Sequence, residues 1–363
     1  MTMATHPADW QTTDKIVVEE AALDNAAVIA EIDAWVLAHP ESTPFHRPAW
    51  VQAVARGTGQ TAMILVARSA TGTITGLLPL TLVRSRLFGK ALVSVGFSVD
   101  GGILADDPAV ADALALACWA QAERHGCPTA ELRGGVLPGT GWALREGAYL
   151  NFSRALASDD ATQLAQIPRK HRAEVRKGLD KSLTFEVGDT PRLRAIHYRL
   201  YAESVHRLGT PVFPKRLFDE VLDRLGQDAD ICLVSQDGTP LSSILSLYHN
   251  GVCMPYWQGA SGAARAMRSN EVAYFQLMSH ARARGCHSFD FGRSKVGTGP
   301  AAWKKSWGWE GTPLSYAVRS AEGQEARDIN PLSPQYQRKV ELWKKLPLPI
   351  ANLIGPYIAR GLG

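Results

Sequence analysis

FDFGRSKVGTGPAAWKKSWGWE, residues 289–310, is the stretch on which the interpretation of this chain depends. Residues 288–291 alternate polar and aromatic side chains and predict a short strand, which Gly292 ends because glycine adopts backbone angles that other residues resist. Four cationic side chains follow within thirteen residues: Arg293, Lys295, Lys304 and Lys305. A loop that combines glycines, cationic donors and three tryptophans suits an anionic or carbonyl-bearing ligand. The alternative is a structural hairpin whose tryptophans fill the core and whose lysines are solvated.

The residues before this stretch repeat an earlier part of the chain. HGCPTAELRG at 125–134 matches RGCHSFDFGR at 284–293 at one constant offset of 159 residues. In the first copy, strand patterns at 62–68, 74–84 and 91–97 precede a helix capped by Asp107 and a strand at 129–134. In the second copy, strand patterns at 230–235, 241–249 and 252–261 precede a helix from 270 and the strand at 288–291. A duplicated unit explains both halves.

The repeat also indicates where the chemistry lies. Glu131 and Asp290 occupy equivalent positions, but only the second copy continues into the stretch of lysines and tryptophans. Cys127 and Cys286 are equivalent as well, so both are interpreted as small buried residues. The five cysteines form no CxxC pair and are odd in number, which argues against a disulfide framework and a zinc site. We predict no metal, and a site mainly in the second copy.

Length and charge set the class of protein. A chain of 363 residues suits two domains, and a net charge of +4 is too small to indicate a nucleic-acid binder by itself. No signal-peptide pattern and no run of eighteen apolar residues is found, so we expect a cytoplasmic protein. After Tyr316 the strand pattern ends, and the chain finishes in a tail that is basic and then apolar. This tail either packs on the body or rests at a membrane surface.

Two further segments could contact a ligand. Residues 168–181 carry six basic and two acidic side chains, and their spacing predicts an amphipathic helix. Its basic face, with Arg169, Arg172 and Arg176, either contacts phosphates or a nucleic acid or is simply solvated. A later helix ends at LGTP, and this loop, with Arg207 and Thr210, could lie over a ligand site.

These features together resemble a known family. The tandem units, the strand YWQGAS at 256–261, the basic helix, and FDFG followed by WKKSWGWE are similar to the Fem family of non-ribosomal peptidyl transferases. FHRPAW, PRKHRAEVRKGL and RLGTPVFPKRLF resemble most the Fem-related proteins of the PEP-CTERM and exosortase system of Gram-negative bacteria. The similarity spans about residues 40–320. It implies an α/β protein with two tandem GNAT-like domains, each a mixed sheet flanked by helices. We place them at 1–155 and 183–325, with a basic helical connector at 156–182 and the tail at 326–363.

The resemblance implies transfer of an acyl or aminoacyl group to an amine. It assigns Lys304, which follows Trp303, to stabilising charge on the donor carbonyl, with Lys305 beside it. Arg293 and Lys295 would hold a phosphate or sugar acid, and Asp290 would orient Arg293 or the amine. Four more residues are expected to bind substrate: Trp303, Tyr256, Arg207 and Thr210.

The donor and the acceptor are less closely defined. Trp303 replaces the usual phenylalanine, and the helical arm of some members that use tRNA is not evident. RAMRSNEVAYF has no glycine between Arg265 and Phe275, so acyl-CoA is a less favoured donor than aminoacyl-tRNA or another ester, and no cofactor is predicted. The expected acceptor is a cell-envelope or exopolysaccharide precursor. The alternatives are an acyl-CoA enzyme and a non-catalytic binding partner in exopolysaccharide or exosortase assembly.

Overall fold

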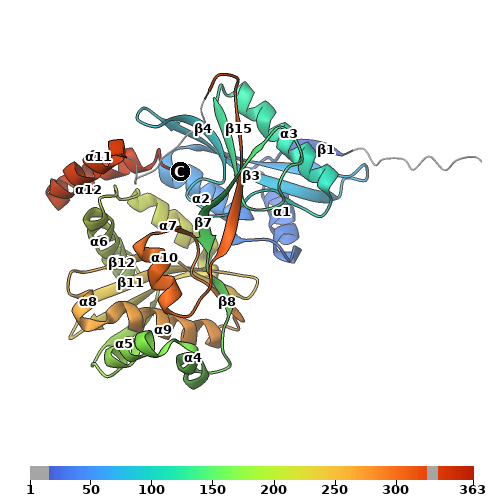
Figure 1. The fold of residues 1–363 in the computed structure, drawn as a ribbon. Helices are drawn as coiled ribbons and strands as arrows, with labels where there is room; N and C mark the ends of the chain where they lie inside the picture. The colour runs from blue at the N-terminus through green and yellow to red at the C-terminus, as the bar shows by residue number, and fades with distance from the viewer. Residues whose placement is uncertain (1–15, 325–333) are drawn as a thin grey trace, which may run out of the picture.

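Two mixed β-sheets, flanked by helices, organise the chain (Figure 1). The computed structural model describes residues 16–324 and 334–363. Within these ranges one sheet has nine strands and the other has six. The α/β architecture therefore agrees with the sequence-based prediction.

The nine-stranded sheet has the order β1-β2-β3-β4-β6-β15-β7-β14, with β5 paired to β3. Its strands are β1 (Val17–Glu20), β2 (Thr61–Arg68), β3 (Ile74–Ser85), β4 (Gly89–Ser94), β5 (Leu104–Ala105), β6 (Thr129–Arg133), β7 (Ala143–Asn151), β14 (Ser294–Lys295) and β15 (Thr312–Ser320). The helices that accompany it in sequence are α1 (Ala26–Ala38), η1 (Pro44–His46), α2 (Pro48–Thr58) and α3 (Pro108–Arg124). Helix α3 begins where the sequence predicted, because the Asp107 side chain accepts a hydrogen bond from the Ala109 amide.

The six-stranded sheet has the order β8-β13-β12-β11-β10-β9. Its strands are β8 (Ser153–Ala155), β9 (Thr184–Gly188), β10 (Ala229–Gln236), β11 (Thr239–His249), β12 (Val252–Ala260) and β13 (Ser288–Asp290). The remaining helices are α4 (Asp160–Gln166), α5 (Arg169–Leu179), α6 (Pro191–Leu208), α7 (Lys215–Leu225), η2 (Gly226–Asp228), α8 (Ala264–Met267), α9 (Ser269–Ala283), α10 (Gly299–Ser306), α11 (Pro334–Lys345) and α12 (Leu348–Ala359).

The two halves share one pairing scheme. Strands β2, β3 and β4 are antiparallel neighbours, and β4 is parallel to β6 after helix α3. Strands β10, β11 and β12 repeat this arrangement, with β12 parallel to β13 after helix α9. We call these two units the first and the second module. Their common order is the repeat that the sequence indicated.

Two segments cross from one sheet to the other. Strand β7 lies in the nine-stranded sheet and continues through the fully buried Phe152 into β8 of the six-stranded sheet. Beside it, β13 continues into β14, and Gly292 makes the turn between them at φ 69°. The stretch from Phe289 therefore joins the two modules, and its backbone turn needs a residue that tolerates positive φ.

Two expectations about local structure were wrong, and one strand was not predicted. Residues 299–306 form helix α10 rather than a loop, with Pro300 in its first turn. The strand pattern does not end after Tyr316, because β15 runs to Ser320 and pairs with β6 and β7 of the nine-stranded sheet. Strand β7 was not predicted, since it is largely exposed and has little apolar alternation. The domain boundaries remain a prediction, and β15 shows that the nine-stranded sheet includes residues beyond 311.

Candidate functional site

Lys304 lies where the segments β7–β8 and β13–β14 pass from one sheet to the other, a place that we call the crossing. Helix α10 directs its Nζ toward the turn after β13, where it donates to the carbonyl oxygens of Gly292 at 2.8 Å and Arg293 at 3.1 Å. The residue is only 9% exposed, and Nζ lies 5.4 Å from the centre of the Phe152 ring. Burial lowers the pKa of Lys304 to about 8, although the nearby charge of Asp290 acts in the opposite direction. Lys304 is therefore not a solvated lysine, whereas Lys305 is exposed.

Two carboxyl groups belong to this neighbourhood: the buried Asp290, whose charge acts on Lys304, and the half-buried Asp100, on which the charge of Asp290 acts. Asp290 accepts hydrogen bonds from Asn151 Nδ2 at 3.1 Å and from the Gly292 amide at 2.7 Å, and burial raises its pKa. These contacts, rather than the expected one to Arg293, orient its side chain. Asp100 accepts from the Gly101 amide at 2.6 Å, and burial together with the charge of Asp290 raises its pKa to about 6. Asp100, Asp290 and Lys304 thus form a group whose pKa values move toward neutrality, as general acid–base chemistry requires.

A cavity of about 580 Å³ is lined mainly by strands of the nine-stranded sheet, and Lys304, Asp290 and Asp100 are not part of its lining. Its charged and aromatic lining consists of Glu131, Arg133, Arg145, Glu146, Tyr149, Arg293, Lys295 and Tyr316. The guanidinium of Arg293 lies 4.4 Å from the centre of the Tyr149 ring and donates to the Tyr316 hydroxyl at 2.7 Å. That hydroxyl in turn donates to the Val99 carbonyl at 2.8 Å. Four cationic side chains outnumber the two carboxylates of this lining, and together with two phenol rings they suit an anionic ligand with a flat or ring-shaped part.

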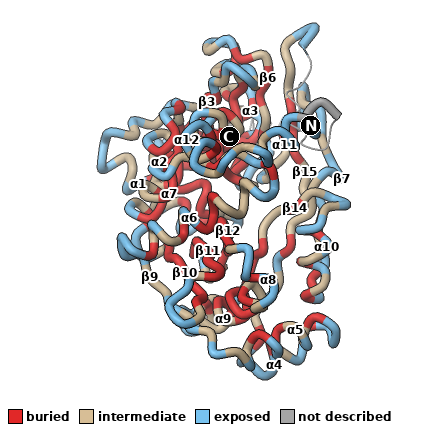
Figure 2. Tube along the Cα trace, turned by 90° about the vertical axis from the view of Figure 1, so that its left-hand side faces the viewer, coloured by how far each residue is buried: buried red, intermediate tan, exposed pale blue. Residues whose placement is uncertain are grey.

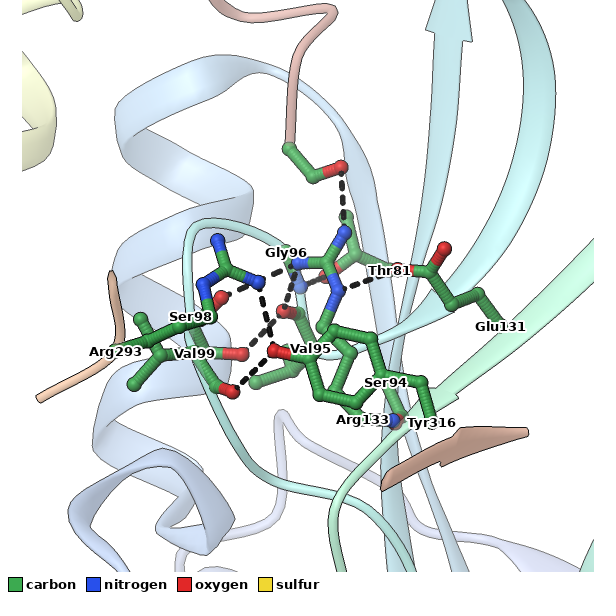
Figure 3. A network of polar contacts seen from close by, with 11 residues as sticks. Thr81, Ser94, Val95, Gly96, Ser98, Val99, Glu131, Arg133, Arg293 and Tyr316 are labelled. Atoms are coloured by element: carbon green, nitrogen blue, oxygen red, sulfur yellow. Dashed lines mark hydrogen bonds and ion pairs between the residues drawn. The ribbon is translucent and has the colours of Figure 1, made fainter. Parts of the chain in front are cut away.

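Arg133 is held in place at this cavity by four acceptors (Figure 3). Its Nε donates to Glu131 at 2.7 Å, and one terminal nitrogen donates to the carbonyls of Val95 and Ser98 at 3.3 Å each. The other terminal nitrogen donates to the Gly363 carbonyl at 3.3 Å. Burial alone would raise the pKa of Glu131, but the charges of Arg133 and Arg293 outweigh burial and lower it.

The structure brings together some of the predicted site residues. Asp290 and Lys304 meet at the crossing, and Arg293 and Lys295 line the cavity beside it. Tyr256 is half-buried at a bulge of β12, where its hydroxyl donates to the Phe97 carbonyl at 2.5 Å. The charges of Arg293 and Asp100 act on Tyr256, so it belongs to the same neighbourhood.

The other predicted residues lie away from the cavity lining. Trp303 packs on Tyr274, with ring centroids 4.8 Å apart, so its ring belongs to the core of the second module. Arg207 donates to the Ala260 carbonyl at 2.5 Å, and Thr210 is exposed. Arg169 and Arg176 are exposed on α5, and Arg172 donates to the Ala165 carbonyl at 3.0 Å.

Four residues of the candidate site were not identified from the sequence: Asp100, Arg133, Tyr149 and Tyr316. The repeat offered one signal, because it aligned Glu131 with Asp290 and so pointed to the end of β6 as well as β13. Tyr149 and Tyr316 lie on β7 and β15, whose pairing could not be read from local pattern. In the part of the chain that the structure describes, no cluster of three or more His, Cys, Asp or Glu side chains is arranged to hold a metal ion.

Comparisons with known proteins agree with this architecture. Residues 167–305 match the model of the acetyltransferase (GNAT) domain. The crystal structure of FemX superposes with a TM-score of 0.63 at 17% identity, over 87% of this chain and 98% of that one. A tandem GNAT protein from the clavulanic acid biosynthesis pathway gives 0.56 at 12% identity, over 86% and 100%. The N-myristoyltransferase of Saccharomyces cerevisiae gives 0.52 at 10% identity, over 93% and 90%. No curated protein matches the chain.

The fold class is thereby confirmed as two tandem GNAT-like modules. The acetyltransferase (GNAT) domain matched at residues 167–305 supports an acyltransferase. Its paired modules follow the Fem-like arrangement seen in FemX, and identities this low show the shared fold only.

Proposed function

We propose that the protein transfers an acyl or aminoacyl group from an ester donor to an amine, at the crossing between its modules. The observation that carries this proposal is the buried ammonium of Lys304 beside Asp290, with Asp100 nearby. An ammonium has three protons, and two are directed at the carbonyls of Gly292 and Arg293. In the proposed reaction the third is donated to the carbonyl oxygen of the donor.

The reaction then needs few groups. The amine nitrogen adds to the donor carbonyl carbon, a C–N bond forms, and negative charge develops on the carbonyl oxygen. Lys304 stabilises this charge, an effect of about 3 kcal/mol for one well-placed donor. The carboxylate of Asp100 or Asp290 takes the proton that the amine loses. The intermediate then collapses, the bond from the carbonyl carbon to the ester oxygen breaks, and the leaving oxygen accepts a proton.

The cavity supports an anionic acceptor. Arg293 and Lys295 come from the segment that crosses after β13, Arg145 comes from β7, and Arg133 comes from β6 of the first module. Such a set suits the phosphate or sugar-acid part of an activated precursor, with Tyr149 and Tyr316 beside its rings. A cell-envelope or exopolysaccharide precursor has this chemistry. We therefore retain that acceptor, together with the association with the PEP-CTERM and exosortase system, as part of the proposal.

Acidic side chains at the helix starts favour an ester donor over acyl-CoA. In GNAT-like modules the helix after the third strand would present its N-terminus to a pyrophosphate. Here α9 carries Glu271 in its first turn, and Asp107 already caps the first turn of α3. Both carboxylates would repel a pyrophosphate. Aminoacyl-tRNA is an ester donor of the required kind, and the exposed Arg169 and Arg176 of α5 are candidates for contacts with its phosphates.

The bonds of Lys304 also favour a second candidate function. An ammonium that donates to two backbone carbonyls could serve only to hold the crossing, in a protein that binds a precursor without modifying it. The cellular location belongs to the proposal too: we place the protein in the cytoplasm, with its C-terminal tail at the membrane surface. Within the described residues, no helix combines the length and apolar character that crossing a bilayer demands.

A deletion strain provides the test. Mass spectrometry of its envelope polymers should reveal a missing acyl or aminoacyl substituent, and a wild-type copy should restore it. A copy with Lys304→Met should fail to restore the substituent while the purified variant still folds and binds the precursor. If Lys304→Met restores the substituent, or if deletion removes none, the proposed function is wrong. Calorimetry with acetyl-CoA should give no binding heat, and measurable heat would favour the acyl-CoA alternative.

A further inference from the structure

Helix α12 packs with its small residues inward. Ala351, Gly355 and Ala359 are buried and lie four residues apart, so they form one face of the helix. A Cβ atom on Gly355 would lie 3.1 Å from Val212, which shows how closely the helix approaches the loop after α6. This face attaches α12 to the body.

The opposite face carries large apolar side chains. Leu353 and Tyr357 are each 70% exposed, Ile350 is 48% exposed and Ile354 is 37% exposed. On the preceding helix α11, Leu342 is 67% exposed. A helix on a water-facing surface ordinarily buries its large apolar residues and exposes polar ones. We call the set Leu342, Ile350, Leu353, Ile354 and Tyr357 the apolar face.

Basic residues accompany the apolar face. Residues 334–363 contain five basic side chains and one acidic one. Lys344 and Lys345 end α11, and Arg360 follows α12 with its guanidinium 5.8 Å from the centre of the Tyr357 ring. Figure 1 shows α11 and α12 side by side at the margin of the molecule, where a flat surface can reach them. In Figure 2 the tube of α12 carries exposed as well as buried segments, as a helix with one face on the body and one face outward does.

We propose that the apolar face and its basic residues dock on the surface of an anionic bilayer. Leucine, isoleucine and tyrosine side chains enter the boundary between headgroups and acyl chains, while lysine and arginine attract anionic headgroups. A second copy fits less well, because two faces of the same positive charge would repel each other. Helix α12 has 12 residues, so it lies in the interface rather than across it.

Docking would bring the cavity close to the headgroups. Leu362 and Gly363, directly after α12, line the 580 Å³ cavity, and Gly363 accepts from Arg133. A precursor carried by a lipid could then enter the cavity from the bilayer surface. The docking itself does not depend on acyl transfer, so its failure leaves the proposed function standing.

Co-sedimentation of the full chain with vesicles tests the docking. Binding should be clear with vesicles of equal parts phosphatidylglycerol and phosphatidylcholine and at least about tenfold weaker with phosphatidylcholine alone. Leu353→Asp with Tyr357→Asp should weaken binding to the anionic vesicles by about tenfold or more. Leu116→Asp is the matched control, because Leu116 is 67% exposed on α3 of the first module, and it should bind like the wild type. Equal losses in both variants would overturn the proposal.

The lysines give a second test that avoids the apolar face. Lys344→Gln with Lys345→Gln should weaken binding by about fivefold per charge at low salt, and Lys215→Gln on α7 should not. This variant keeps the test valid if the aspartate variant fails to fold. Absence of binding to anionic vesicles would refute the docking. Sedimentation velocity can show the other outcome, a dimer. If the wild type forms a dimer but binds no vesicles, and if Leu353→Asp dissociates this dimer while the lysine-to-glutamine variant does not, the apolar face binds a second copy and the docking proposal is wrong.

Discussion

The two modules differ most at one equivalent pair of positions, Glu131 on β6 and Asp290 on β13. In the first module Arg133 donates to Glu131, and the net effect of its surroundings lowers the pKa of the carboxyl group. In the second module Asp290 receives only neutral donors, Asn151 and the Gly292 amide, and burial raises its pKa. The same scaffold therefore lowers the pKa of the carboxyl group in one copy and raises it in the other. An adjacent guanidinium decides which result is obtained.

This difference assigns separate tasks to the modules. The nine-stranded sheet that contains the first module supplies most of a basic cavity, and β13 of the second module and the following α10 supply the carboxyl group and the lysine at the crossing. Burial raises the pKa of both equivalent thiols, Cys127 and Cys286, which disfavours a thiolate nucleophile in either copy, although Cys286 is half-buried rather than buried as expected. We expect substitutions in the second module to affect the rate of transfer and substitutions at the cavity to affect binding.

The largest effect is expected at Lys304. Lys304→Met should lower the transfer rate constant by about 10²- to 10³-fold, because the donor to the developing oxyanion is lost. Lys305→Met, at the exposed neighbour, should change it by less than about threefold. Steady-state kinetics on both variants makes the comparison. If Lys305→Met proves the more harmful change, the carbonyl stabiliser has been assigned to the wrong lysine.

The dependence of the rate on pH should follow Lys304 and Asp100. Lys304 must keep its proton to stabilise an oxyanion, and its pKa is lowered to about 8, so the rate should fall about tenfold per pH unit above 8. Asp100 must lose its proton to accept one, and its pKa is raised to about 6, so the rate should also fall below 6. In Lys304→Arg the alkaline limb should disappear. A limb that persists in Lys304→Arg would belong to another group.

Arg133 provides the corresponding test of the first module. Arg133→Leu should raise the KM for the acceptor by about tenfold and leave kcat nearly unchanged, because a contact with the bound anion is lost in ground state and transition state alike. Isothermal titration with the precursor would measure the loss directly. A fall in kcat with unchanged KM would contradict the division of tasks between the modules.

The smallest effect is expected on stability. The folded-state pKa of Asp100 is about 6 and its ordinary value is 3.8, so the protonated form favours folding. This contribution is complete below pH 3.8 and is lost as the pH rises through 6. Asp100→Asn should therefore raise the free energy of unfolding by about 1 kcal/mol above pH 6 and have little effect near pH 4. Urea denaturation at both pH values measures this, with the exposed Glu322→Gln as control. Equal effects at the two pH values would mean that the charge is not the cause.

Much of the fold could be predicted from local pattern. Asp107 before Pro108 located the start of α3, and the repeat of Cys127 and Cys286 located the equivalent strands β6 and β13. These features depend on neighbours in sequence or on the alternation of apolar residues, so they are visible in one dimension. The importance of the stretch from Phe289 to Glu310 was visible for the same reason, although α10 was taken for a loop.

The pairing of distant segments could not be predicted. Strand β15, which begins after residue 311, pairs with β6 and β7 of the nine-stranded sheet, and β14 pairs with the other edge of β7. These pairings leave no periodic pattern in the sequence. Tyr149, Arg293 and Tyr316 meet only because of that pairing. Arg133 likewise finds acceptors in the backbone carbonyls of Val95 and Ser98, in the loop after β4. The pKa of Asp100 is raised in part by the charge of Asp290, which belongs to the other module.

The sequence by itself determined the duplicated unit, the glycine that turns the chain after β13 and the set of cationic residues that follows it. Only the tertiary structure decided that Lys304 is buried, that Asp290 lacks a guanidinium partner and that α12 exposes its large apolar side chains. The physical reason is that burial and charge pairing depend on which segments lie opposite one another in space. Segments from both modules meet at the crossing, and no local pattern in either of them records that meeting.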